Sequence, residues 1–185
     1  MPKPSTDALT EKRLAQAADI ARAARIYNLP AIEMALTAAT FGVDGDPSRT
    51  HAILCKQWLR VVKLCVGRHH AIAWVRTVEP HNWGLRAAPV WRGVVWTTAV
   101  DFVTEAIRTA FRDSASIGLT PAEDPKQAAV ALILALQTMG EGEQPRKWAM
   151  QYHIRRFQVG GKATLGLMPH HTAQAPTETP NLGTG

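Results

Sequence analysis

The sequence predicts an all-α protein in which a single helical-bundle core lies between a flexible N-terminal arm and a flexible C-terminal tail. Three observations support this prediction. Forty-six per cent of the 185 residues are apolar, which is enough to cover one core. Apolar residues recur at three- and four-residue steps in several long segments. Both ends are rich in small and polar residues, so residues 1–9 are assigned to the arm, 10–160 to the core and 161–185 to the tail.

The first half of the chain predicts three helical segments. Residues 10–27 are rich in alanine and place small residues along one face of a helix. Residues 30–41 follow as a second helix, because Pro30 is accepted in a first helical turn. After a break rich in glycine and aspartate, residues 49–78 form the longest apolar-periodic segment, which Gly67 could divide.

The second half predicts three further helices. Residues 94–111 are rich in β-branched residues and could by themselves form a strand, but their length and apolar spacing favour a helix. A helix over residues 120–139 has the clearest start, since Thr120 is a good cap and Glu123 closes a capping box. The last helix spans residues 146–157, before the glycine pair at the start of the tail.

Positive charge is concentrated in two stretches. The net charge is +6 and the isoelectric point is near 9.7, which suits a polyanionic partner. Residues 51–112 hold nine Lys and Arg against three Asp and Glu, and residues 146–162 hold five against none. No apolar run is long enough for a membrane span and no secretory signal is found at the start, so we expect no membrane partner.

Cysteines and tryptophans bear on packing more than on chemistry. Cys55 and Cys65 are ten residues apart on a predicted helix, too far in rise to bridge, so we expect reduced core thiols. Most of the six tryptophans are expected in the core. Trp83 and Trp91 lie between arginines in irregular sequence, where a ring could stack on a nucleic-acid base or on a neighbouring subunit.

No set of residues predicts catalysis, a metal site or a cofactor, so we expect a binding protein and not an enzyme. Adjacent histidines on a helix, such as His69 and His70, point about 100° apart, and the pair that begins at His170 lies in the flexible tail, so neither pair predicts a metal site. Arg146 and His153 form an R-x6-H pair, which is the loose signature of helical ribonucleases of the HEPN type. That activity remains an alternative.

A series of short motifs runs along residues 25–140. In order and spacing they resemble motifs of the coat proteins of flexuous filamentous plant viruses, of the potexvirus and carlavirus type. Three motifs depart from the family pattern, and a gap-free match from Ser48 to Trp74 would place Lys63, not Arg60, at the family's arginine. The matching stretches are Leu29-Pro30 with Met34-Ala35, Asp44 to Thr50, Leu59-Arg60, Trp74, Glu79 to Trp83, Ala99 to Val103, and Gly118 to Pro121 with Glu123 and Ala128.

The resemblance implies a viral coat protein that polymerises into a flexible helical filament and encapsidates single-stranded RNA. It implies an RNA-binding groove lined by Ser48, by Arg60 or Lys63, and by Asp101. The basic side chain would bind an RNA phosphate, and a buried Asp101 would orient that basic side chain. It further implies self-contacts through the arm and tail, no cofactor, and a place in the virion and in the host cytoplasm during assembly. A small helical RNA-binding subunit of a bacterial RNA-guided complex is the alternative from another class.

Overall fold

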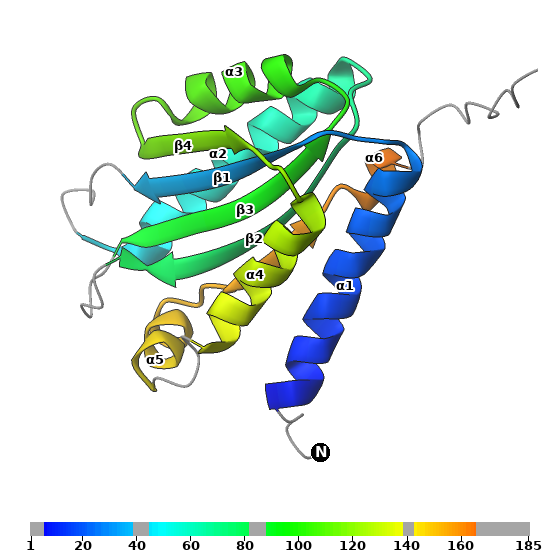
Figure 1. Cartoon of the computed structure of the whole chain (residues 1–185). Helices are drawn as coiled ribbons and strands as arrows, with labels where there is room; N and C mark the ends of the chain where they lie inside the picture. The colour runs from blue at the N-terminus through cyan, green and yellow to red at the C-terminus, as the bar shows by residue number, and fades with distance from the viewer. Residues whose placement is uncertain (1–5, 39–44, 82–87, 139–142, 166–185) are drawn as a thin grey trace, which may run out of the picture.

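The structure is a computed structural model, and it describes residues 6–38, 45–81, 88–138 and 143–165. It has an α/β fold built on a five-stranded antiparallel sheet (Figure 1), so the prediction of an all-α helical bundle is wrong. The elements are α1 (Thr6–Ile26), β1 (Ala31–Ala38), α2 (Pro47–Gly67), β2 (Ile72–Pro80), β3 (Pro89–Thr97), α3 (Val100–Phe111), β4 (Ala115–Pro121), α4 (Pro125–Thr138), α5 (Glu143–Gln151), β5 (Phe157–Gly160) and α6 (Lys162–Leu165).

The strands lie in the order β4-β1-β3-β2-β5, and each is antiparallel to its neighbours. The connection β1-α2-β2-β3-α3-β4 is a ferredoxin-like β-α-β-β-α-β unit, to which β5 adds an edge strand beside β2. Helices α2 and α3 cover one face of the sheet, and α1 and α4 lie against the other (Figure 1). Such a layered fold hosts many functions and identifies none by itself.

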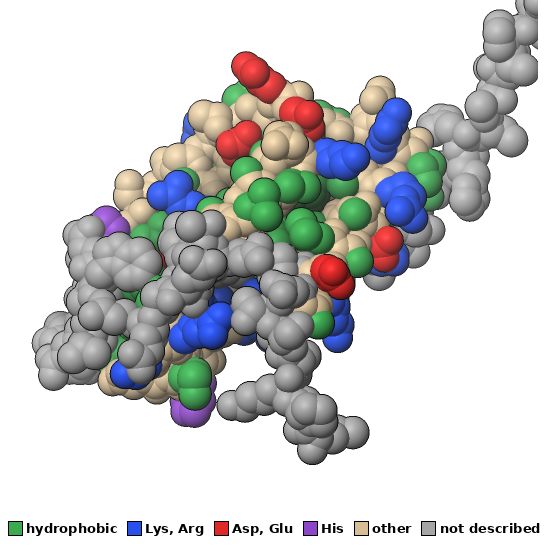
Figure 2. All heavy atoms as spheres, turned by 60° about the horizontal axis from the view of Figure 1, so that its bottom comes forward, with side chains coloured by type: hydrophobic (Ala, Val, Ile, Leu, Met, Phe, Trp, Pro, Cys, Tyr) green, Lys and Arg blue, Asp and Glu red, His purple; other side chains and the backbone are tan. Residues whose placement is uncertain are grey.

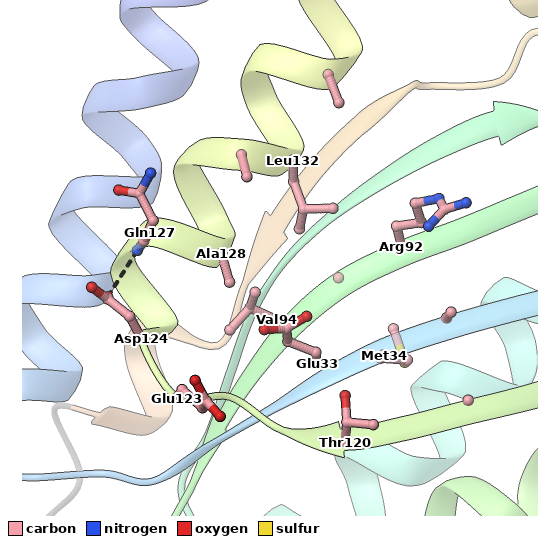
Figure 3. A pocket seen from close by; sticks show the side chains of 15 residues that line it. Glu33, Met34, Arg92, Val94, Thr120, Glu123, Asp124, Gln127, Ala128 and Leu132 are labelled. Atoms are coloured by element: carbon pink, nitrogen blue, oxygen red, sulfur yellow. Dashed lines mark hydrogen bonds between the residues drawn. The ribbon is translucent and has the colours of Figure 1, made fainter.

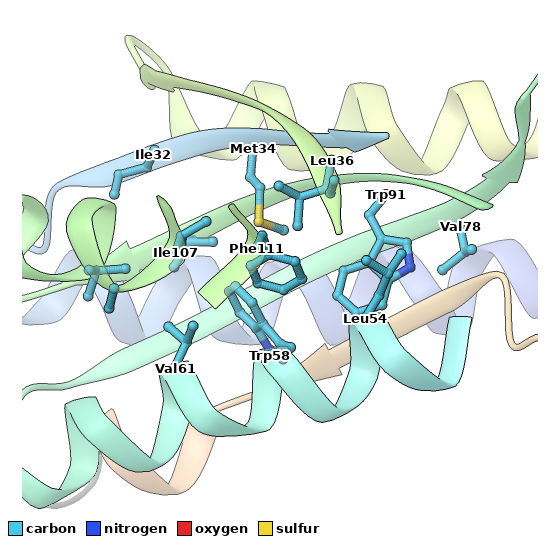
Figure 4. Packing of buried hydrophobic residues seen from close by; sticks show 14 of the residues in the cluster. Ile32, Met34, Leu36, Leu54, Trp58, Val61, Val78, Trp91, Ile107 and Phe111 are labelled. Carbon is cyan, nitrogen blue, oxygen red and sulfur yellow. The ribbon is translucent and has the colours of Figure 1, made fainter. Parts of the chain in front are cut away.

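Each face of the sheet has its own apolar core. On the α2 face, Trp58 and Leu54 of α2 meet Trp91 of β3 and Phe111 of α3, all of them fully buried (Figure 4). On the α1 face, Ala17, Ile20 and Ala24 of α1 and Ile133 of α4 pack against small and branched side chains of β2 and β3. The central strands are therefore covered on both sides.

Residues 30–41, predicted to be helical, contain strand β1. Alanine, glutamate, methionine and leucine favour a helix when considered locally. In the folded chain Ile32, Met34 and Leu36 point into the α2-face core, while Glu33 between them is exposed. This alternation is the period of a strand. Pairing with β3 on one side and β4 on the other satisfies the backbone and overrides the local preference.

Two long predicted helices each combine a helix with a strand. The segment 49–78 is helical only as far as Gly67, the predicted point of division, and then continues as β2. The segment 94–111 begins inside β3 and becomes helical at Val100. Both strands are buried on both faces, so their sequences are nearly continuous apolar runs that lack the alternation of a half-buried strand.

The remaining elements agree in part with the sequence predictions. Helix α1 confirms the helix expected at residues 10–27 and begins earlier, at Thr6, within the expected arm. Thr120 lies in β4 and does not cap a helix there; α4 begins at Pro125. The last predicted helix ends at Gln151, and the chain beyond it forms β5. Among the described residues, none of the helices has the length and apolar character needed to cross a membrane.

Candidate nucleic-acid interface

Helix α2 carries three of the four residues predicted to bind RNA, and its inner side anchors it to the sheet. Leu54, Trp58 and Val61 recur at three- and four-residue steps and are fully buried (Figure 4). At the N-terminus the side chain of Asp46 accepts a hydrogen bond of 2.9 Å from the backbone N–H of Ser48. Such a cap satisfies a free donor of the first turn. Because one side of α2 is held in this way, its opposite side faces solvent.

Lys56, Arg60 and Lys63 form a basic ridge on the solvent side of α2, and all three are exposed. At about 100° per residue they fall within roughly 60° of one another around the helix axis and span about 10 Å along it. Within the described part of the chain none of them forms an ion pair. No Asp or Glu occurs between Pro47 and Val78. The basic ridge is therefore a positive surface without compensating acids on its own helix.

Exposed aliphatic side chains flank the basic ridge. Leu59 is 56% exposed and Leu64 is 52% exposed, on opposite sides of the ridge, and Ile53 and Val66 are nearly as exposed. Single exposed aliphatic residues are common on protein surfaces, but four on one 21-residue helix are a concentration. The outer side of α2 thus offers both positive charge and flat apolar contact area.

The structure brings together only part of the predicted RNA-binding set. Arg60 and Lys63, predicted from the sequence as alternatives, both lie on the basic ridge. Ser48 is in the first turn of α2, where its backbone N–H is engaged by the helix cap. Asp101 lies in the first turn of α3 and is exposed, not buried, and it forms no ion pair with any described residue. The structure does not show the expected arrangement, in which a buried Asp101 orients the side chain of Arg60 or Lys63.

Other residues singled out from the sequence do not assemble into a site. Trp91 is fully buried in the α2-face core and cannot stack on an external ring, and Trp83 lies outside the described residues. Arg146 is exposed in α5, and His153 is exposed beyond the end of that helix. Helix α5 packs against strand β2 and ends before His153, so Arg146 and His153 do not lie on one helix.

A buried arginine in β2 was missed by sequence reasoning. Arg76 is only 4% exposed, and its Cζ lies 3.6 Å from the ring centroid of Trp91. Its Nε donates a hydrogen bond of 3.0 Å to Oε1 of Gln158, and its Nη2 donates to the same oxygen. Burial lowers the pKa of Arg76 to about 10. The signal available in the sequence was a basic residue, Arg76, among the apolar residues of β2. A charged residue is seldom buried without a partner, so such a residue points to a specific set of contacts.

The neighbours of Arg76 form a chain of polar contacts that reaches α2. The indole Nε1 of Trp91 donates to Nδ1 of His51 at 3.2 Å, so the imidazole proton resides on Nε2. That Nε2 lies 3.5 Å from Sγ of Cys55, which is also 3.8 Å from Nη2 of Arg76. Burial raises the pKa of the Cys55 thiol, and the charge of Arg76 opposes this effect. Because the imidazole donates to sulfur, it does not act as a base toward the thiol.

The two cysteines agree in part with the sequence prediction of core thiols. Cys55 and Cys65 are both free thiols, Cys65 is fully buried in the α2-face core and Cys55 is half-buried at its edge. Burial also raises the pKa of Cys65, to about 11. The thiol of Cys65 is therefore protonated at neutral pH and serves packing.

His51 makes folding stability depend on pH. Burial, with the nearby charge of Arg76, lowers the pKa of His51 from 6.5 to about 4 in the folded chain. Between these values the unfolded chain binds a proton that the folded chain does not, so stability should fall as pH decreases from about 6.5 to about 4. Urea denaturation at pH 7.0, 5.5 and 4.5 measures this loss. We expect a smaller loss in His51→Gln and an unchanged loss in the exposed control His81→Gln; equal losses in all three proteins would contradict the assignment.

A groove lies on the other face of the sheet from α2, where α4 leaves β1 and β4 partly uncovered. It encloses about 780 Å³. Glu33, Glu123 and Asp124 gather at one end and Arg92 lies at the other (Figure 3). Asp124 is engaged as a helix cap, since its Oδ1 accepts from the backbone N–H of Gln127 at 2.9 Å. Seen from the side of α1 and α4, apolar side chains gather around a hollow with acidic side chains at its upper edge (Figure 2). Three carboxylates repel a polyanion, so the groove does not suit the partner that the basic ridge suits.

Comparisons with known proteins add no relative. No family model, no curated protein and no solved structure matches the chain significantly. Function therefore has to be argued from the geometry of the chain itself.

Proposed function

We propose that the chain binds single-stranded nucleic acid through the basic ridge of α2, with little preference for base sequence. The observation that carries this proposal is the alignment of Lys56, Arg60 and Lys63 on one exposed helix side without compensating acids. Lysine and arginine contacts to phosphate supply most of the affinity of sequence-tolerant nucleic-acid binders.

The aliphatic side chains beside the basic ridge favour a single strand over a duplex. In a duplex the base faces are stacked inside, and the outer surface offers phosphate, sugar and groove edges. A single strand also exposes base faces, which gain from contact with apolar side chains such as Leu59 and Leu64. The basic ridge with its aliphatic flanks can therefore engage both parts of a single strand.

The coat-protein role stays a prediction that rests on the motif resemblance alone. That resemblance implied an all-helical subunit, and the α/β fold does not supply one. Encapsidation of single-stranded RNA and polymerisation into a filament need self-contacts, and the outer side of α2 supports only the RNA-binding half of that role. The proposal is accordingly limited to nucleic-acid binding.

A second kind of partner has to be separated by experiment. A helix side with both basic and aliphatic side chains also suits an anionic membrane surface. Fluorescence anisotropy should be measured with a labelled 20-nucleotide single strand of RNA or DNA and with the corresponding duplex, and co-sedimentation with phosphatidylserine-containing vesicles. We expect binding to the single strands, weaker binding to the duplex, and an affinity that falls steeply with salt. Vesicle binding without single-strand binding would overturn the proposal.

A further inference from the structure

A cleft of about 520 Å³ opens at the sheet edge formed by β2 and β5, beside α2. Its size lies in the range of sites that hold small organic molecules. The cleft is bounded by α2, by strand β2, by the edge strand β5 and by the exposed side chain of Gln16 from α1. It is separate from the acidic groove on the other side of the sheet, with which it shares no lining residue.

Aromatic rings form part of the cleft wall. Trp58 and Trp74 meet edge to face with ring centroids 5.4 Å apart, and Phe157 lies on the β5 side. Trp74 is half-buried and passes directly over Gly160, its cross-strand partner. A Cβ at Gly160 would overlap the indole ring, so the absence of a side chain there allows Trp74 to occupy its position. Rings held in this way suit a flat ligand.

The polar lining of the cleft is cationic and amide, and none of the described lining residues is acidic. Arg76 lies at the inner end and makes no ion pair with any described residue. Its Nη1 is buried and has no hydrogen-bond partner within the described part of the chain. Arg155 is exposed at the rim, and the amides of Gln16 and Gln158 complete the polar lining. Amides can donate to and accept from the edge of a nucleobase.

The cleft is continuous with the basic ridge through one residue. Leu59 lines the cleft and lies on the side of α2 between the cleft and the ridge. Lys56 is three residues before Leu59 and Lys63 is four residues after it, and side chains three or four apart on a helix are neighbours. A strand whose phosphates follow the ridge would therefore pass the mouth of the cleft.

We propose that this cleft holds one unstacked nucleobase of the bound single strand, with Trp74 against the ring and Gln16 and Arg155 at the rim. This inference rests on the proposed function, because it assumes that the basic ridge carries the strand. A base buried against aromatic side chains adds affinity whatever its sequence, since every base has a ring face. The pocket would anchor the strand, while the ridge supplies the salt-dependent part of binding.

The test compares two probes of equal length and charge, a 12-nucleotide oligothymidylate and the same backbone without bases. We expect the full-length chain to bind the oligothymidylate about tenfold or more tightly than the abasic strand. The double variant Gln16→Ala with Arg155→Ala changes only exposed side chains, and Gly160→Ala displaces Trp74. Both should lose the preference for bases while keeping the affinity for the abasic strand to within a few-fold. Arg108→Ala on α3 is the control for the lost charge and should keep the preference.

Three results would count against the inference. Equal binding of both strands by the parent protein overturns the base pocket and leaves the proposed function intact. A preference that persists in both cleft variants, with unchanged thermal melting, places the base contact elsewhere and also overturns the inference. Failure of the parent protein to bind either strand removes the proposed function and the pocket together.

Discussion

Reversing the charge of the basic ridge, with Lys56→Glu, Arg60→Glu and Lys63→Glu in one protein, should abolish single-strand binding while the chain stays folded. The three side chains are exposed and form no ion pair with described residues, so the fold does not depend on them. Three phosphate contacts on a single strand correspond to a slope of log affinity against log salt of about −2. Neutral Gln replacements at the same positions should therefore make the measured slope shallower by about 2.

The control for this experiment makes the same change in net charge at a different place on the protein. Arg22, Arg25 and Lys126 lie on α1 and α4 at the opposite face of the sheet, and all are exposed. Reversing these three changes the net charge of +6 to zero, just as reversal of the ridge does. We expect the control protein to bind the strand with an affinity close to that of the parent. If both triple variants lose affinity equally, binding depends on total charge and the ridge has no special part in it.

Trp58→Ala should lower the free energy of unfolding by about 3–5 kcal/mol, the usual cost of removing a large buried aromatic side chain. Trp58 is 1% exposed and lies where α2 meets the sheet, next to Trp74 and beneath the guanidinium of Arg76. Its loss leaves a cavity between α2 and β2 that the rigid strands cannot close. Urea denaturation followed by circular dichroism measures the change.

The neighbouring residue provides the matched control for Trp58. Leu59 follows Trp58 in the same helix but is 56% exposed, so Leu59→Ala should change the free energy of unfolding by no more than about 0.5 kcal/mol. A Trp58→Ala protein within about 1 kcal/mol of the parent would show that α2 does not depend on this contact with the sheet. Such a result would also weaken the case for the cleft, because Trp58 forms part of its wall.

The sequence alone could predict elements whose stability is local. Helix α2 has buried positions at three- and four-residue steps, an N-terminal cap and a glycine at its end, and these signals lie within one segment. Its basic side follows directly, because residues at helical spacing share a side wherever the helix is placed. Arg60 and Lys63 were named from the sequence as alternatives, through the motif resemblance, and helical spacing places both of them and Lys56 on one side of α2.

The strands could not be recognised in the same way, because their signals are not local. Strand β1 is made of good helix formers and is a strand only because β3 and β4 pair with both of its edges. Strands β2 and β3 are covered by helices on both faces, so they show apolar runs where a half-buried strand would alternate. The all-α prediction failed at these three central strands.

The chain sequence by itself determined the helical segments α1 and α2, the excess of positive charge and the alignment of Arg60 with Lys63. Only the tertiary structure decided that Asp101 is exposed, that Arg76 is buried beneath Trp91, and that a cleft forms beside α2. The physical reason is the range of the interactions. Helical periodicity and capping act within a few residues, whereas burial of Arg76 depends on Gln158, 82 residues further along the chain, and on a strand pairing that no single segment encodes.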